Sequence, residues 1–164
     1  MIRIEVQRDE QAISAVLEAA FPTHAESELV SELRQNWNLS ISLVAEIDEA
    51  IVGHVAFSPA FIDGAAPGMG LAPMAVLPEF QRRGVGTLLA NEGLKFAENA
   101  AIPFVIVLGD PEYYRRFGFR PAADWNIEGE FGGGPAFQLI EFVSGSVPTD
   151  GGLARYSKEF RKFG

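Results

Sequence analysis

Residues 71–87 read Leu-Ala-Pro-Met-Ala-Val-Leu-Pro-Glu-Phe-Gln-Arg-Arg-Gly-Val-Gly-Thr, and this stretch decides which fold the chain can adopt. Residues 70–77 are apolar at most positions, which predicts a strand buried on both faces. Pro73 interrupts it, and because proline has no N–H to donate, we expect sheet pairing on one side to break there. The break would leave backbone groups of residues 74–76 free to pair with an extended ligand that carries amides. A bulge at a sheet edge is the alternative interpretation of Pro73.

The second part of the stretch is a loop directly before a helix predicted over about residues 84–99. A helix start offers unpaired N–H groups and the positive end of the helix dipole, so phosphate is its natural ligand. Gly84 and Gly86 allow the backbone to approach such a ligand closely. The loop is not a P-loop, because no Gly-Lys-Ser/Thr follows. It is not a dinucleotide-binding Gly-x-Gly-x-x-Gly motif either, because Leu89 occupies the position of the third glycine. On its own, a loop of this kind is most often only a tight turn.

The rest of the chain predicts an α/β (α+β) domain. Apolar alternation or continuous apolar runs predict strands near residues 2–6, 42–47, 51–57, 70–77, 104–108, 127 and 136–143. Helical spacing predicts helices near residues 9–20, 26–35 and 84–99, and a short helix that begins at Asp110 and ends at Gly118. We expect Asp9 to cap the first helix. With 164 residues and no linker, residues 1–164 are expected to form a single domain with a mixed sheet.

Composition narrows the chemistry further. A hydrophobic content of 48% with 21% charged residues is typical of a globular protein and excludes a disordered one. The absence of cysteine excludes disulfides, thiolate metal sites and a cysteine nucleophile, and two histidines leave little for a metal site, so no metal is expected. The amino terminus resembles no signal peptide, and the longest apolar run, residues 100–108, is too short to span a bilayer. A cytoplasmic protein without membrane contact is therefore expected.

The net charge of −9 is distributed unevenly. Residues 1–65 carry eleven acidic and three basic side chains, residues 66–120 carry five and six, and residues 121–164 carry six and four. An acidic chain binds nucleic acid poorly, so no nucleic-acid partner is expected. The locally basic middle segment is suited to an anionic ligand, although the acidic residues elsewhere can equally be a solvated surface.

Two segments resemble a known superfamily. Residues 71–86 resemble the acetyl-CoA motif of the GNAT superfamily of N-acetyltransferases, with its Gln/Arg-x-x-Gly-x-Gly/Ala loop, and residues 109–119 resemble that superfamily's second CoA segment, which ends in Tyr-x-x-x-Gly-Phe. Together with residues 53–58, the pattern is similar to the bacterial YhbS-like branch. The resemblance covers about residues 1–120. It implies a mixed, mainly antiparallel sheet of about seven strands flanked by about four helices, in which the strands at 70–77 and 104–108 splay apart.

The resemblance also implies acetyl-CoA as the co-substrate. The backbone of Met74 and Val76 would pair with the pantetheine amides, and the N–H groups from Arg82 to Thr87 would cradle the pyrophosphate. The expected CoA contacts are Met74, Ala75, Val76, Gln81, Arg82, Arg83, Gly84, Val85, Gly86, Thr87, Gly109 and Tyr113. Homodimers are common in the superfamily, which makes a homodimer one expectation for this chain.

The expected reaction moves an acetyl group from the CoA thioester to a primary amine on a small molecule or a peptide. The amine must be neutral, the oxyanion needs a hydrogen-bond donor, and the departing thiolate needs a proton. By resemblance the proton donor is Tyr114, four residues before Gly118, and a phenol of pKa about 10 is well matched to a thiol of about 8.5. Without a cysteine, transfer is expected to be direct, within a ternary complex. A non-catalytic acyl-CoA sensor, which needs the loop but not Tyr114, is the alternative.

The general base stays open at this point. Many members of the superfamily place a glutamate in or beside the strand that corresponds to residues 70–77, and this strand holds no acid. The candidates on the substrate side are Glu28, Glu46, His54 and Glu79. His54 is more simply explained as a structural histidine, and a water chain or an amine that arrives neutral needs no base at all. The acidic amino-terminal part favours a cationic amine as acceptor.

Overall fold

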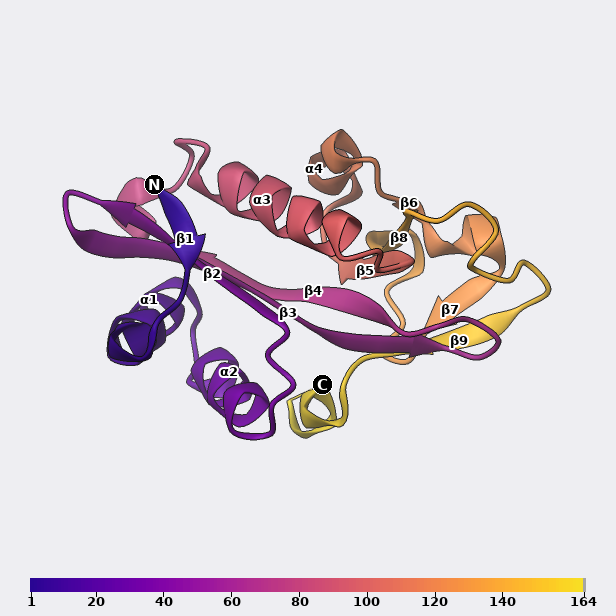
Figure 1. Ribbon diagram of the computed structural model, residues 1–164, viewed down its shortest axis with the longest axis horizontal. Coiled ribbons are helices and arrows are strands. Elements are labelled where there is room, and N and C mark those ends of the chain that lie inside the picture. The colour runs from indigo at the N-terminus through magenta and orange to yellow at the C-terminus, as the bar shows by residue number, and fades with distance from the viewer. Residues whose placement is uncertain (164) are drawn as a thin grey trace.

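The strand β4 (Gly68–Val76) lies inside a nine-stranded sheet in the computed structural model, which describes residues 1–163 (Figure 1). The other strands are β1 (Ile2–Ile4), β2 (Ile41–Ile47), β3 (Ala50–Ile62), β5 (Phe104–Leu108), β6 (Arg120–Pro121), β7 (Ile127–Gly129), β8 (Phe137–Glu141) and β9 (Gly152–Arg155). The order along the sheet is β1-β2-β3-β4-β5-β8-β6, and β9 pairs with both β3 and β7. All pairs are antiparallel except β4–β5 and β7–β9, so the predicted mixed, mainly antiparallel sheet is confirmed.

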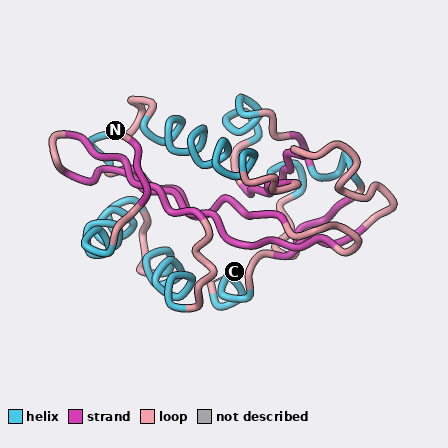
Figure 2. Tube along the Cα trace, viewed as in Figure 1, coloured by secondary structure: helices cyan, strands magenta, loops and turns pink. Residues whose placement is uncertain are grey.

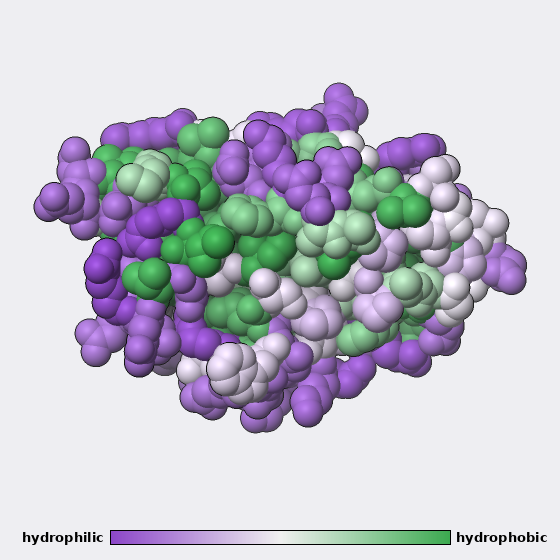
Figure 3. All heavy atoms as spheres, viewed as in Figure 1, coloured by the Kyte–Doolittle hydropathy of each residue, from purple (hydrophilic) through white to green (hydrophobic). Residues whose placement is uncertain are grey.

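Helices cover both faces of this sheet (Figures 1 and 2). They are α1 (Glu10–Ala20), α2 (Ala25–Gln35), α3 (Val85–Asn99) and the single turn α4 (Pro111–Tyr114). Along β3, Ala56 packs with α1 and α2, whereas Val55 and Phe57 pack with α3, as the two-residue period of a strand requires. Gly93 lets α3 approach the sheet closely, because a Cβ there would lie 2.2 Å from the Phe57 ring. Each face of the sheet is therefore covered by its own cluster of buried apolar side chains. In the same view, hydrophilic residues lie mainly at the margins and hydrophobic residues gather in the middle of the face (Figure 3).

The pairing between β4 and β5 stops early. Only Met69 with Val105 and Gly70 with Ile106 are paired, so the rest of β4 has no partner on that side. On its other side β4 stays paired with β3, but the register shifts around Ala72 and Pro73. The strand carries a bulge at Ala72 and Pro73, but toward β3 and not at an edge of the sheet, and its pairing with β5 already ends at Gly70.

The structure also departs from the sequence-based expectations. It has nine strands rather than about seven, because β6 and β9 span only two and four residues and show no usable periodicity. The strand predicted over residues 51–57 continues to Ile62. Asp9 precedes α1, but its carboxylate accepts hydrogen bonds from the Val6 N–H at 2.7 Å and from Arg3, so the expected side-chain cap of α1 is wrong. Within residues 1–163, no helix is both long enough and apolar enough to cross a membrane.

Candidate active site

The loop that joins β4 to α3 leaves its backbone donors unused. Arg82 (φ 64°) and Gly84 (φ 85°) adopt the left-handed conformation, so the chain turns sharply before α3. Within residues 1–163, no N–H from Arg82 to Thr87 donates to a protein acceptor, and the first N–H of this helix to do so is that of Leu88, which bonds Gly84 O at 3.0 Å. Unpaired donors at the positive end of a 15-residue helix are arranged as they are in anion-binding sites.

A cavity of about 410 Å³ lies against this loop, and we call it the loop cavity. Its lining residues are Val76, Phe80, Gln81, Arg82, Gly84, Val85, Gly86, Thr87, Tyr113 and Arg116. A Cβ added at Gly86 would find no atom closer than 3.6 Å, so packing within the protein does not require a glycine there. Its lack of a side chain instead keeps room open on the cavity side. Three arginines at or beside the cavity, Arg82, Arg83 and Arg116, match the locally basic charge of this segment.

The open edge of β4 connects this cavity with a second one. The Leu77 N–H donates to Val52 O at 2.8 Å, so by alternation the backbone groups of Met74 and Val76 point away from β3, toward the gap. The Gln81 side chain donates to Val76 O at 3.0 Å, which agrees with that direction. Val76 lines the loop cavity and Met74 lines the second cavity. One strand edge whose backbone groups pair with no other strand therefore runs from one cavity to the other.

The second cavity, also about 410 Å³, is mostly apolar, and we call it the apolar cavity. Its lining residues are Phe21, Ala25, Glu26, Leu29, Leu71, Ala72, Pro73, Met74, Leu108, Tyr114, Phe131, Phe160 and Phe163. Among these, Glu26 is the one charged side chain. Its Oε1 atom is shielded from solvent and has no hydrogen-bond partner within the described residues. The cavity thus has one half-buried carboxylate side chain among apolar walls.

The two tyrosines of α4 belong to different cavities. Asp110 accepts a hydrogen bond from the Glu112 N–H at 3.0 Å and Pro111 follows it, so the short helix starts as the sequence predicts. The Tyr113 hydroxyl lies 2.9 Å from Thr87 Oγ1 beside the loop cavity, whereas Tyr114 lines the apolar cavity.

Burial controls the chemistry of Tyr114. Its ring packs against the rings of Tyr113, Phe117 and Phe119. Burial of the phenol raises the pKa of Tyr114 to about 12, with a smaller electrostatic contribution from the neighbouring Tyr113. The phenol is therefore protonated at neutral pH and is available as a hydrogen-bond donor. Gly109 makes room for it, because a Cβ there would lie 2.5 Å from Tyr114 Cε2.

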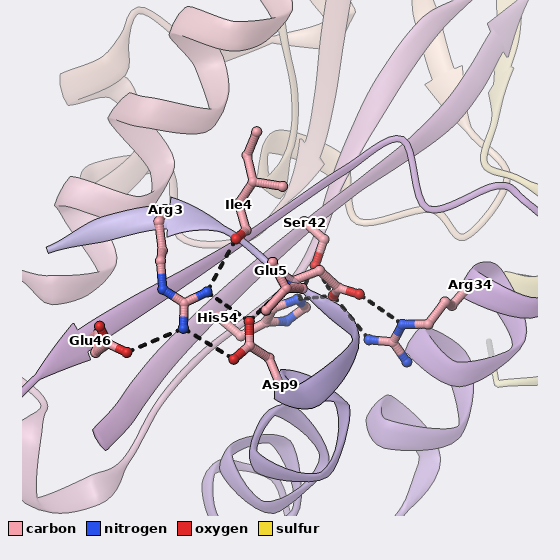
Figure 4. A network of polar contacts seen from close by, with 9 residues as sticks. Arg3, Ile4, Glu5, Asp9, Arg34, Ser42, Glu46 and His54 are labelled. Carbon is pink, nitrogen blue, oxygen red and sulfur yellow. Dashed lines mark hydrogen bonds and ion pairs between the residues drawn. The ribbon is translucent and has the colours of Figure 1, made fainter. Parts of the chain in front are cut away.

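The candidates for the general base lie apart from both cavities. His54 is buried in the sheet, with Nε2 2.8 Å from Ser42 Oγ and 3.9 Å from Glu5, and burial lowers its pKa to about 4 (Figure 4). Glu46 forms an ion pair with Arg3 at 3.2 Å in the same region (Figure 4). Glu28 and Glu79 are exposed, and neither of the cavities includes them in its lining.

Sequence reasoning missed Glu26, although a signal was present. Glu26, Leu29 and Leu33 lie at helical offsets of zero, three and seven, so the glutamate stands on the apolar stripe of α2. An acid at such a position faces the protein rather than solvent.

Within residues 1–163, no cluster of three His, Asp or Glu side chains could hold a metal ion.

Comparison with known proteins identifies the family. Residues 11–119 match the Acetyltransferase (GNAT) family. The uncharacterized N-acetyltransferase YhbS of Escherichia coli (strain K12) is 35% identical over 166 residues, which cover 99% of each chain. The crystal structure of E. coli YhbS in complex with CoA superposes with a TM-score of 0.92 over 100% of this chain and 93% of that one. A Brucella melitensis GNAT acetyltransferase in complex with acetyl-CoA is 38% identical, with a TM-score of 0.83 over 98% and 97% of the two chains. The predicted resemblance is confirmed: the chain belongs to the GNAT family and is an N-acetyltransferase.

Proposed function

We propose that the protein transfers the acetyl group of acetyl-CoA directly to a primary amine while both substrates are bound. The observation that carries this proposal is the open edge of β4, which runs from the unpaired N–H groups of the loop cavity to Tyr114 in the apolar cavity. An extended donor with a charged end and a reactive end fits such a path. The relatives that were crystallised with CoA and acetyl-CoA support the choice of donor.

The donor half of the site uses mainly backbone groups. The N–H groups from Arg82 to Thr87 would bind the pyrophosphate, with Arg82 and Arg83 adding charge and the Tyr113–Thr87 hydrogen bond holding the cavity wall. The outward-facing groups of Met74 and Val76 would pair with the pantetheine amides. Because the Gln81 side chain bonds the Val76 carbonyl, pairing there would exchange one donor for another. Ala75 contributes packing, since its side chain is buried.

Gly109 was among the CoA contacts expected from the sequence, but we do not include it in the proposed donor site. Its N–H donates to Ala136 O at 3.0 Å, and its carbonyl accepts from Gln138 Nε2 at 3.2 Å, so both backbone groups are engaged within the protein. The role we propose for Gly109 is to leave space for the Tyr114 ring.

The chemistry requires one bond to form and one to break. The neutral amine attacks the thioester carbonyl, a C–N bond forms, the C–S bond breaks, and CoA leaves as the thiol. Nitrogen loses one proton and sulfur gains one, and Tyr114 donates the latter and is reprotonated by the former. A free thiol has a pKa near 8.5, so donation from a phenol of about 12 is uphill in isolation. Enclosure of the sulfur in the same apolar cavity raises the thiol pKa as well and narrows that gap.

Two measurements on the same preparation test the proposal. Release of free thiol is followed with acetyl-CoA and a panel of primary amines, and calorimetry measures acetyl-CoA binding to the same preparation. The proposal expects heat with acetyl-CoA and thiol release that depends on the amine. Binding without release for every amine would instead indicate an acyl-CoA sensor, and no binding would contradict the donor site itself.

A further inference from the structure

We infer that the acceptor is a primary amine joined to an apolar, preferably aromatic, group that carries no carboxylate, and that Glu26 binds its ammonium. The inference rests on the proposed function, because it names the substrate class of that same site. It is carried by the apolar lining of this cavity and by Glu26, the one carboxylate in that lining.

The walls of the cavity select for apolar surface. Four phenylalanines from three separate parts of the chain line it, together with leucines, alanines and Met74. Phe21 lies at the end of α1, Phe131 follows β7, and Phe160 and Phe163 come from the turn η6 (Lys158–Lys162) and the residue after it. Aromatic rings gain most from contact with other rings and with aliphatic surface. A purely polar acceptor would leave most of this lining without a partner.

The carboxylate of Glu26 supplies the complementary polar contact. Glu26 is half-buried and lines the cavity, so a ligand N–H can reach its side chain there, and an ammonium beside it adds a favourable charge interaction to a carboxylate whose shielded Oε1 has no hydrogen bond within the described residues. Two buried or half-buried acids of the amino-terminal part, by contrast, already have cationic partners: Asp9 pairs with Arg3 at 2.7 Å, and Glu5 pairs with Arg34 at 2.9 Å. Glu26 has no ion-pair partner among the described residues.

The same lining argues against other amines. Arginine and lysine are absent from the described residues that line the cavity, so the carboxylate of a free amino acid would be buried without a counter-charge. A polyamine would place a second ammonium among phenylalanines, with Glu26 as the one acid. The acidic amino-terminal part therefore favours a cationic amine through this single carboxylate, not through its total charge of −8.

Matched pairs of amines test the substrate class at saturating acetyl-CoA. We expect kcat/KM to be at least tenfold higher for phenethylamine than for ethylamine, and at least tenfold higher for L-phenylalaninamide than for L-phenylalanine. Spermidine is expected to react more slowly than phenethylamine. Equal or better turnover of ethylamine, L-phenylalanine or spermidine than of its apolar counterpart would overturn the inference while leaving the acetyltransferase function intact.

Substitution tests Glu26 itself. Calorimetry of phenethylamine with CoA-loaded protein measures acceptor binding without turnover, so it remains decisive if no amine is acetylated. Glu26→Gln is expected to weaken phenethylamine at least tenfold in this titration and to raise its KM, while acetyl-CoA affinity stays unchanged. Glu28→Gln is the matched control, because Glu28 is exposed on the same helix and lies outside the cavity lining. Unchanged amine binding in a folded Glu26→Gln protein, or an equal loss in Glu28→Gln, would overturn the role of Glu26.

Discussion

Tyr113 and Tyr114 are neighbours in the chain but line different cavities, with ring centroids 5.0 Å apart and planes at 89°. Successive residues of a helix point about 100° apart, so one turn can present one phenol to each half of a site. Tyr113 bonds Thr87 beside the loop cavity, and Tyr114 lies where the amine is proposed to react. Donor binding and chemistry should therefore respond separately to substitution.

Removal of the Tyr114 hydroxyl should slow the reaction and spare donor binding. For Tyr114→Phe we expect kcat to fall by about 10²-fold or more, the usual contribution of a positioned general acid. The Kd for acetyl-CoA, measured by calorimetry, should stay within about twofold of wild type, because the proton from Tyr114 is needed only as the C–S bond breaks and contributes little to binding of the intact thioester. Tyr113→Phe is the paired control: it should weaken acetyl-CoA with a smaller effect on kcat. Wild-type kcat in Tyr114→Phe would exclude Tyr114 as the proton donor.

Two glycine-to-alanine substitutions should have opposite signatures. Gly109→Ala places a Cβ 2.5 Å from Tyr114 Cε2, so we expect displacement of that ring and a lower kcat with donor affinity retained. In Gly86→Ala the new methyl group finds no close protein atom, and the change gains up to about 1 kcal/mol of helix propensity. It should therefore raise the free energy of unfolding yet weaken acetyl-CoA binding. Denaturant titration and calorimetry measure both, and unchanged acetyl-CoA affinity in Gly86→Ala would argue against the loop cavity as the donor site.

The arginines of the loop should bind the donor through charge. Arg82→Ala with Arg83→Ala is expected to weaken acetyl-CoA by about tenfold at low ionic strength, because charge-assisted contacts to phosphate are lost. The difference from wild type should shrink as salt is added. Arg115→Ala provides the control, since that exposed side chain pairs with Glu112 at 3.6 Å and is outside the lining of the loop cavity. A loss that does not depend on salt would indicate a structural defect instead.

Buried His54 should make the fold acid-sensitive in a defined range. Its folded pKa of about 4 lies below the ordinary value of 6.5, so the unfolded chain binds the proton first. The neutral, buried His54 therefore contributes about 3 kcal/mol to the free energy of unfolding above pH 6.5, and this contribution is lost as the pH falls toward 4. Asp9 and Glu159 have pKa values lowered to about 2, so most of their contribution to the free energy of unfolding is lost at a lower pH than that of His54.

Urea unfolding at pH 7 and pH 4.5 measures this loss. His54→Gln should show a much smaller difference between the two conditions, because glutamine does not titrate. No loss of wild-type stability between these pH values would contradict the neutral, buried state of His54.

The donor half of the site was predictable because its cues are local. Pro73 cannot pair, and the sheet opens beside it; Gly84 precedes α3, and the unpaired N–H groups lie there. Helix and strand boundaries followed the apolar spacing to within a few residues in most elements. In each case a short stretch of sequence contains the physical reason for the structure.

The acceptor half was not predictable in this way. Its walls come from α2, from the segment after β7 and from η6, which lie far apart in sequence and have no shared periodicity. The candidates Glu28 and Glu46 were chosen by charge and general position, whereas only packing of these distant segments places Glu26 in the cavity.

The turn η6 lies against α2 through Lys162, whose Nζ is 2.9 Å from Glu32, and through Glu159, which accepts hydrogen bonds from Asn36 and Asn38. Phe160 thereby joins the lining of the apolar cavity, together with Phe21 and Leu29 from a distant part of the sequence. The loop cavity of the proposed donor site, by contrast, is lined from within residues 76–87 except for Tyr113 and Arg116. Under this proposal, substitutions near Phe21, Phe131 and Phe160 are expected to change which amine is acetylated while residues 76–87, and donor binding with them, stay the same.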